Sequence, residues 1–134
     1  MSAKRTIMLE GTKISQEYIT GEVFYKMRQT DIKPFNSIIK DVFFKSGSRN
    51  NWHIYAGLQM LIVTEGIGYY QERGTPIRLI RKGEVITIPA GVEHWHGASP
   101  NSLFSHIVIA TDIDKGGVKW LERVTDEEYN SFIE

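Results

Sequence analysis

The sequence has no cysteine, no long apolar run and no excess of charge of either sign. Without cysteine the chain can form no disulfide or thiolate metal site, so any metal must be held by nitrogen and oxygen ligands. No stretch approaches the ~18 consecutive apolar residues of a membrane-spanning helix, and residues 1–10 lack the apolar core of a secretory signal. These absences predict a soluble, cytoplasmic protein without a membrane partner.

Charge and length narrow the class of protein further. Lysine plus arginine number 16 and aspartate plus glutamate number 16, so the formal net charge is zero. Such a chain has no strong field for attracting nucleic acid, and it contains no DNA-reading motif or basic stripe. A length of 134 residues is typical of one domain with one sizeable core. We therefore expect a single domain over residues 1–134 and no nucleic-acid partner.

The remaining pattern is a series of short apolar runs with period-two alternation, rich in β-branched and aromatic residues. It predicts an all-β fold in which many short strands form a barrel or a sandwich. A capping box at Thr125–Glu128 predicts a short C-terminal helix that covers one end of the sheet. The expected strands are Gly21–Lys26, Ser37–Lys45, Trp52–Tyr55, Leu58–Glu65, Gly68–Glu72, Ile77–Ile80, Glu84–Ile88, His94–Gly97 and Leu103–Thr111.

Alternation places several polar side chains on the inner face of these strands. The parity that buries Leu61 also buries Gln59 and, continued backward, Tyr55 and His53. In the segment that begins at Ser37, the more apolar face includes Lys40. A buried polar group without a partner costs on the order of 1 to 3 kcal/mol, so these groups need partners. We therefore expect a polar floor inside an otherwise apolar barrel.

Histidine is scarce, and its positions form two spaced motifs. The first runs from Gly47 through five residues to His53, one residue to Tyr55, three residues to Gln59 and six residues to Gly66. This spacing resembles that of the first cupin motif, which usually offers two histidines and a glutamate.

The second motif follows some seventeen residues later in the chain. It runs from Gly83 through five residues to Pro89, then to Gly91, His94 and Ala98. Its spacing resembles that of the second cupin motif. Both motifs occur in order in a β-rich chain, and together they cover residues 47–98.

The detail around the second motif resembles one subgroup of cupins. The segments Ile88–Ala98 and Ser105–His106, followed by Trp120 and Val124–Tyr129, resemble small cupins related to carboxymuconolactone decarboxylase proteins, a group that includes manganese-dependent cupin hydroxynitrile lyases. The resemblance implies a double-stranded β-helix, the jelly-roll barrel of RmlC-like cupins, with barrel strands over about residues 21–111. It also implies a small-molecule substrate or ligand and a homodimer or higher homo-oligomer.

The resemblance implies a metal site formed by His53, Gln59 and His94. Two nitrogens and one oxygen suit a divalent transition metal, namely Mn, Fe, Zn, Ni or Co. Tyr55 stands where the motif usually has its second histidine, and ionising a phenol at pH 7 costs about 4 kcal/mol before a cation offsets it. Tyr55 is therefore either a ligand, a substrate contact or filler, and the alternative to a metal site is a vestigial polar pocket.

Three further residues are candidates for chemistry. His106 shares a face with apolar neighbours and can act as a proton shuttle, and the resembled lyases have a matching histidine in the active site. His96 shares the face of His94 if the strand is straight; otherwise it is a hydrogen-bonded surface histidine. Lys40 either contacts an anionic substrate or extends toward the mouth of the barrel.

Two main functions remain. The first is a metal-dependent enzyme in which the metal acts as Lewis acid, His106 moves a proton, and Tyr55 or Lys40 stabilises developing negative charge. Its reaction is carbon–carbon bond cleavage of the lyase type, decarboxylation, isomerisation or oxygenation. The alternative is a non-catalytic small-molecule-binding cupin with a degenerate metal site. A third hypothesis is a subunit that associates through its terminal strands.

Overall fold

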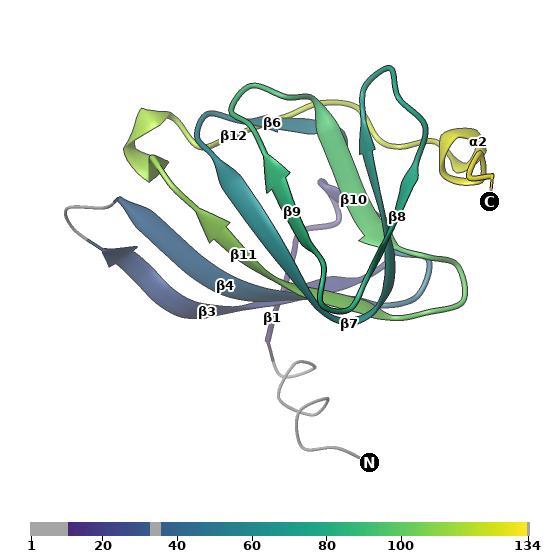
Figure 1. Ribbon diagram of the computed structural model, residues 1–134, viewed down its shortest axis with the longest axis horizontal. Coiled ribbons are helices and arrows are strands. Elements are labelled where there is room, and N and C mark those ends of the chain that lie inside the picture. Colours follow the sequence, from purple (N-terminus) through teal and green to yellow (C-terminus); the bar gives the residue numbers. More distant parts are fainter. Residues whose placement is uncertain (1–10, 33–35, 134) are drawn as a thin grey trace, which may run out of the picture.

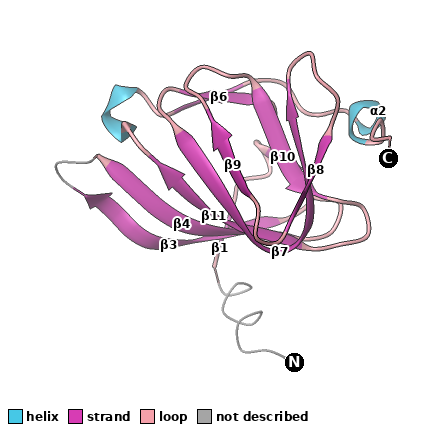
Figure 2. Cartoon of the chain, viewed as in Figure 1, coloured by secondary structure: helices cyan, strands magenta, loops and turns pink. Residues whose placement is uncertain are grey.

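The computed structural model describes residues 11–32 and 36–133. Residues 1–10, where no secretory signal was expected, lie outside the described residues. Strands dominate the described chain, as the sequence predicted, and Figure 2 shows how few residues are helical. The helical elements are the 3-10 helix η1 (Ile113–Lys115) and the helix α2 (Asp126–Tyr129), and neither is long and apolar enough to cross a membrane.

The strands pair antiparallel into one curled sheet, which has the architecture of the expected jelly-roll barrel (Figure 1). The main path through the sheet is β1-β3-β4-β11-β7-β10-β5-β2, while β6, β8, β9 and β12 pair beside it. The strands are β1 Thr12–Lys13, β2 Ile19–Thr20, β3 Val23–Ile32, β4 Ser37–Phe44, β5 Arg49–Asn50, β6 His53–Tyr55, β7 Gln59–Glu72, β8 Arg78–Arg81, β9 Val85–Ile88, β10 His94–Ala98, β11 Phe104–Ala110 and β12 Val118–Trp120.

Strand β7 connects the two halves of the curled sheet. Its first part pairs with β11 and β9, and its second part, from Gly68 onward, pairs with β10. The sequence predicted two separate strands here, whereas the structure contains one continuous strand of 14 residues. Gly66 has φ 78°, and a Cβ on Gly68 would lie 2.5 Å from the ring of Phe104. Glycine therefore lets the strand bend at this point without breaking.

The inner face of the sheet has the alternation that the sequence predicted. Leu61 and Val63 of β7 are buried together with Gln59, and Phe104 and Val108 of β11 are buried with His106. The apolar core inside the curled sheet consists of Ile19, Val23, Val42, Phe44, Leu61, Val63, Tyr70, Ile80, Ile86, Ile88, Ala98, Phe104 and Val108. The polar residues on this face therefore lie against an apolar wall.

A second apolar cluster covers the outer face of β10. It comprises Trp52, Tyr69, Ile77, Trp95, Val124 and Tyr129. The predicted capping box is confirmed: the Thr125 hydroxyl accepts from the Glu128 backbone N–H, and the Glu128 carboxylate accepts from the Thr125 backbone N–H. Arg49, which is buried, donates to Asp126 over 2.8 Å and packs against the ring of Tyr129. The C-terminal segment is thus fixed to the sheet, and all five residues of β10 are buried.

Candidate metal centre

Three histidines converge where β6 meets β10. His53 and His94 are direct partners in the antiparallel register, and their ring centroids lie 4.2 Å apart. His96 lies two residues further along β10 on the same face as His94, because side chains alternate along a strand. One ring nitrogen from each of the three residues lies within 4.8 Å of the others, and all three side chains are buried.

The backbone fixes the orientation of two of these rings. Nδ1 of His53 lies 2.8 Å from the carbonyl oxygen of Asn51, and Nδ1 of His94 lies 2.9 Å from that of Val92. A carbonyl only accepts, so each Nδ1 carries the proton and each neutral ring has its lone pair on Nε2. Nε2 of His94 is buried without a partner. This is the tautomer and orientation that a histidine metal ligand requires.

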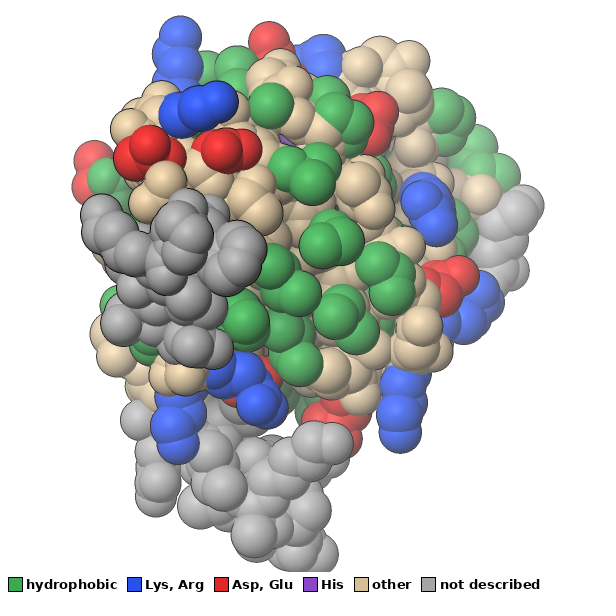
Figure 3. Space-filling view, turned by 60° about the vertical axis from the view of Figure 1, so that its left-hand side comes forward, with side chains coloured by type: hydrophobic (Ala, Val, Ile, Leu, Met, Phe, Trp, Pro, Cys, Tyr) green, Lys and Arg blue, Asp and Glu red, His purple; other side chains and the backbone are tan. Residues whose placement is uncertain are grey.

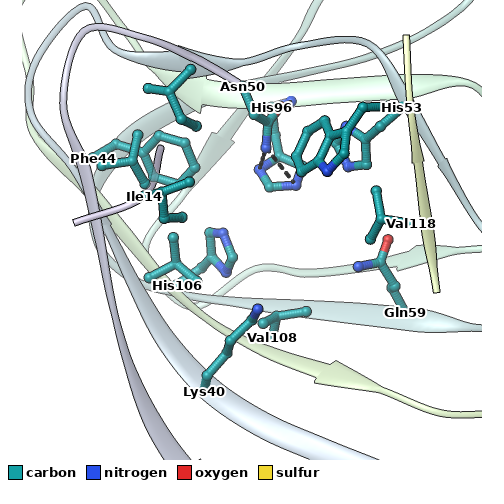
Figure 4. Close-up of a pocket in the computed structure, with 14 residues that line it drawn as sticks. Ile14, Lys40, Phe44, Asn50, His53, Gln59, His96, His106, Val108 and Val118 are labelled. Atoms are coloured by element: carbon teal, nitrogen blue, oxygen red, sulfur yellow. Dashed lines mark hydrogen bonds between the residues drawn. The ribbon is translucent and has the colours of Figure 1, made fainter. Parts of the chain in front are cut away.

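The third histidine is held by Asn50. The Asn50 side-chain oxygen accepts the backbone N–H of His96 over 2.9 Å, and the Asn50 amide nitrogen lies 3.4 Å from both ring nitrogens of His96 (Figure 4). An amide N–H can donate to whichever ring nitrogen is unprotonated. The lone pair of His96 is therefore shared with Asn50, whereas that of His94 is free.

His53 and His96 line a cavity of about 110 Å³ inside the curled sheet, and the ring of His94 lies beside that of His53 outside the lining. Figure 4 shows polar groups that project into it from several strands, including Lys40, Gln59 and His106. The described residues that line it include no aspartate or glutamate. The lining consists of Ile14, Ile19, Val23, Lys40, Val42, Phe44, Asn50, His53, Gln59, His96, His106, Val108, Val118 and Trp120.

The mouth of the cavity is apolar. Val118 is 42% exposed, Ile14 and Trp120 are partly exposed, and Trp120 stacks on Tyr18 with ring centroids 4.6 Å apart. Figure 3 shows hydrophobic side chains gathered on one face, with a small area of histidine visible between them. A ligand that enters here passes apolar groups before it reaches the polar floor.

Several buried polar atoms around the cavity have no hydrogen-bond partner. They are Oε1 of Gln59, Nε2 of His94 and both ring nitrogens of His106. Each such atom costs on the order of 1 to 3 kcal/mol when it is left unpaired in a folded protein. Unpaired polar atoms that gather around one cavity indicate that a bound ion or ligand completes the site.

Burial keeps the histidines of the site neutral. It lowers the pKa of His53 to about 3, with a further contribution from the neighbouring His94. It likewise lowers the pKa of His94 and that of His96. Burial lowers the pKa of His106 to about 3, and the charge of Lys40 acts in the same direction. At neutral pH each of these rings is therefore uncharged and offers one nitrogen lone pair, as metal binding requires.

The residues present fit a divalent metal ion. Neutral imidazoles and an amide oxygen are ligands that divalent transition metals accept, and no thiolate is needed. Ligand nitrogens about 2.1 Å from one ion, at the angles of a tetrahedral or octahedral site, lie about 3.0–3.4 Å apart. In the structure the three nitrogens lie within 4.8 Å of one another, so the rings must rotate inward to share an ion.

Tyr55 is directed elsewhere. Its side chain is buried, but its hydroxyl donates to the carbonyl oxygen of Thr111 over 2.6 Å, and it is not among the cavity-lining residues. Burial raises the pKa of the Tyr55 phenol. A neutral phenol that donates to a backbone carbonyl supports packing of the loop at residue 111.

Sequence reasoning did not identify Asn50 or Trp120 as site residues. Asn50 positions His96, and Trp120 of β12 lies over His53 with ring centroids 4.9 Å apart. The sequence carried one signal for Asn50. It is a polar residue inside the first motif, three residues before the candidate ligand His53. Trp120 was part of the subgroup resemblance, but nothing in the sequence placed it at the site, since it is distant from the motifs and its strand has three residues.

A curled antiparallel sheet with histidines facing its cavity is the architecture of a cupin. The structure matches that of a cupin-like protein from Thermotoga maritima with a TM-score of 0.87 and 47% sequence identity, over 91% of this chain and 93% of that chain. The (R)-mandelonitrile lyase of Granulicella tundricola is 41% identical over 88 residues, which are 66% of this chain and 67% of that protein. The chain belongs to the cupin family.

More distant structures share the fold alone. The polyketide cyclase RemF from Streptomyces resistomycificus has a TM-score of 0.71 and 16% identity, over 91% of this chain and 87% of that chain. No family model matches the sequence. The subgroup that the motifs indicated is supported by the similarity to the Granulicella lyase.

Proposed function

We propose that this cupin is a metal-dependent enzyme with lyase-like chemistry on a small organic substrate. The observation that carries the proposal is the group of three buried histidines, two of them with an Nε2 lone pair set free by a backbone hydrogen bond, beside a cavity in the curled sheet. A purely structural histidine would have a partner on both nitrogens. His53 and His94 each use Nδ1 for a backbone carbonyl and leave Nε2 available to a metal ion.

His53 and His94 would hold the metal, and the third ligand would be His96 or the amide oxygen of Gln59. When bound, a divalent Mn, Fe, Zn, Ni or Co ion supplies a Lewis acid that polarises a carbonyl, carboxylate or hydroxyl oxygen. In His53 and His94 the nitrogen available for this role is Nε2, because the Nδ1 atoms already donate to carbonyls of the same chain segment.

His106 is the residue of the site best placed to move a proton. Its ring lies 5.1 Å from that of His96, between centroids, and neither of its nitrogens has a partner. With a pKa of about 3 it is neutral, so it accepts a proton from the substrate only where negative charge develops beside it. Lys40, on the same wall of the cavity, stabilises negative charge on the substrate.

The Granulicella relative suggests the first substrate to test. Its name assigns it the cleavage of mandelonitrile, a carbon–carbon bond cleavage in which a hydroxyl loses a proton as cyanide leaves. A metal at the histidines would lower the pKa of a substrate hydroxyl, and His106 would take the proton from that hydroxyl and pass it to the leaving cyanide. We therefore infer lyase-type cleavage of a small hydroxyl-bearing substrate for this chain as well.

The test is the metal content and mandelonitrile turnover of the untagged protein. We expect close to one transition metal per chain in the native protein and none in His94→Ala, with cleavage lost in the same variant. His106→Ala is the matched control, because it should keep the metal and lose turnover. A native protein that cannot be loaded with any of the five metals would overturn the proposal and favour a metal-free binding protein.

A further inference from the structure

The cavity contains a positive charge without a protein counter-ion. Lys40 is the charged side chain among the 14 lining residues, and none of those residues is acidic. A divalent ion held by neutral histidines adds positive charge and brings no carboxylate with it. Charge of one sign in a closed, largely apolar cavity is costly unless an anion compensates it.

Lys40 is directed into the cavity. Figure 4 shows its ammonium group beside Val108, below the histidines. The nitrogen lies 5.1 Å from the centre of the Tyr25 ring, and no acidic side chain of the described residues forms an ion pair with it. The neighbouring acid, Asp41, is on the other face of β4 and pairs with Arg28 over 2.6 Å. The counter-ion of Lys40 is therefore absent from the described chain.

We propose that the substrate preferred by this cavity, in contrast to the neutral test compound mandelonitrile, is a small carboxylic acid whose carboxylate pairs with Lys40 while its hydroxyl or carbonyl oxygen faces His53 and His96. The inference rests on the proposed function, because it takes this cavity as the substrate site. It deepens that function by naming the group that the substrate carries at the end remote from the histidines.

The shape and lining of the cavity specify which anion fits. With about 110 Å³ and one ammonium group, the site suits a carboxylate on a short carbon chain. A phosphate, with three oxygens and a higher charge, needs several donors that the wall around Lys40 does not offer. Val42, Phe44 and Val108 line the same cavity and suit hydrocarbon. A 2-hydroxy or 2-oxo acid of a few carbons meets these requirements.

The experiment compares lactate with lactamide, which has the same skeleton and a neutral amide in place of the carboxylate. Binding of each probe is measured by titration calorimetry to metal-loaded and to chelator-stripped protein. The variants are Lys40→Met, which removes the charge, Lys40→Arg, which keeps it, and Lys82→Met as a control at an exposed lysine outside the cavity. Circular dichroism establishes that each variant is folded.

We expect lactate to bind the native protein and to bind Lys40→Met at least about tenfold more weakly, because a charge-assisted hydrogen bond is lost. Lys82→Met should match the native protein, Lys40→Arg should recover part of the affinity, and lactamide should not distinguish Lys40→Met from the native protein. Equal lactate affinity in Lys40→Met, or no detectable binding of lactate, pyruvate or acetate to the loaded native protein, would overturn the inference. Dependence on Lys40 that persists in a protein unable to hold metal would overturn the proposed function and leave only the pairing of Lys40 with a bound carboxylate.

Discussion

His53 and His94 face each other across β6 and β10, and each donates its Nδ1–H to a carbonyl two residues earlier in its own chain segment. The orientation of both rings is therefore a local property of two short strands. It does not depend on a distant side chain, a loop closure or a partner subunit. A site whose ligands are oriented in this way is formed before any ion arrives, and this preorganisation reduces the cost of binding.

The first prediction concerns the third ligand. His96→Ala should lower metal affinity by more than about a hundredfold, because loss of even an outer-shell partner costs about 10–100-fold. Gln59→Ala should lower it less, since His96 belongs to the cluster of nitrogens. Metal affinity is measured by competition with a chelator of known strength. The opposite order of the two variants would restore the ligand set that the sequence suggested, with the oxygen of Gln59 in place of His96.

The second prediction concerns Tyr55. Tyr55→Phe should reduce the free energy of unfolding by about 1 kcal/mol, because the hydrogen bond to Thr111 is lost from a buried site. Metal affinity should not change, since the hydroxyl is not directed into the cavity. Urea unfolding and chelator competition on the same preparation measure both quantities. A Tyr55→Phe protein with normal stability and weakened metal binding would show that the phenol is a ligand after all.

The third prediction concerns acid. The folded-state pKa of His53 and of His106 is about 3, whereas an unfolded histidine titrates near 6.5. Between these values the unfolded chain binds protons that the folded chain does not. The free energy of unfolding of the metal-free protein should therefore fall as pH drops from about 6.5 toward 3, by on the order of 1 kcal/mol per pH unit for each histidine.

The check for this effect is urea unfolding at pH 7 and pH 5, with His106→Asn as the comparison variant. The variant lacks one of the buried titrating rings, so its stability should fall less between the two pH values. Other groups titrate in the same range in both proteins, and the difference between them isolates His106. Identical pH slopes would mean that His106 is protonated in the folded state.

The fourth prediction concerns the C-terminal segment. Tyr129 is buried in the outer cluster, and its hydroxyl donates to the carbonyl oxygen of Ala98 in β10. Tyr129→Ala should cost about 3–5 kcal/mol, as expected for loss of a large buried aromatic side chain. Tyr129→Phe keeps the ring and should cost about 1 kcal/mol. Thermal unfolding of both variants measures the ratio, and equal losses would mean that the hydroxyl rather than the ring holds the segment.

The inner faces of the long strands could be predicted from the sequence, because alternation over many residues is compatible with only one choice of buried face. The burial of Gln59, Lys40 and His106 followed from aliphatic neighbours of the same parity, and Gln59 and His106 are indeed buried while Lys40 lines the cavity. His53 and His94 were located by the spacing of the two cupin motifs. Their spacing reflects a register that the fold imposes. The homo-oligomer stays a prediction.

The short strands could not be predicted in this way. β1, β2 and β5 have two residues each, which is too few for a period to be visible. The direction of Tyr55 was equally inaccessible, because its acceptor, Thr111, lies 56 residues further along the chain. The face of His96 was undecided because a turn precedes it, and the structure shows it buried beside the cavity.

Strand β7 runs unbroken through both halves of the curled sheet, and one wall of the cavity begins with its first residue, Gln59. The two halves therefore share one hydrogen-bonded strand, and a hinge between them would have to bend β7 itself at Gly66. We expect a ligand that needs a wider cavity to displace lining side chains, since separating the two halves would break the pairing of β7.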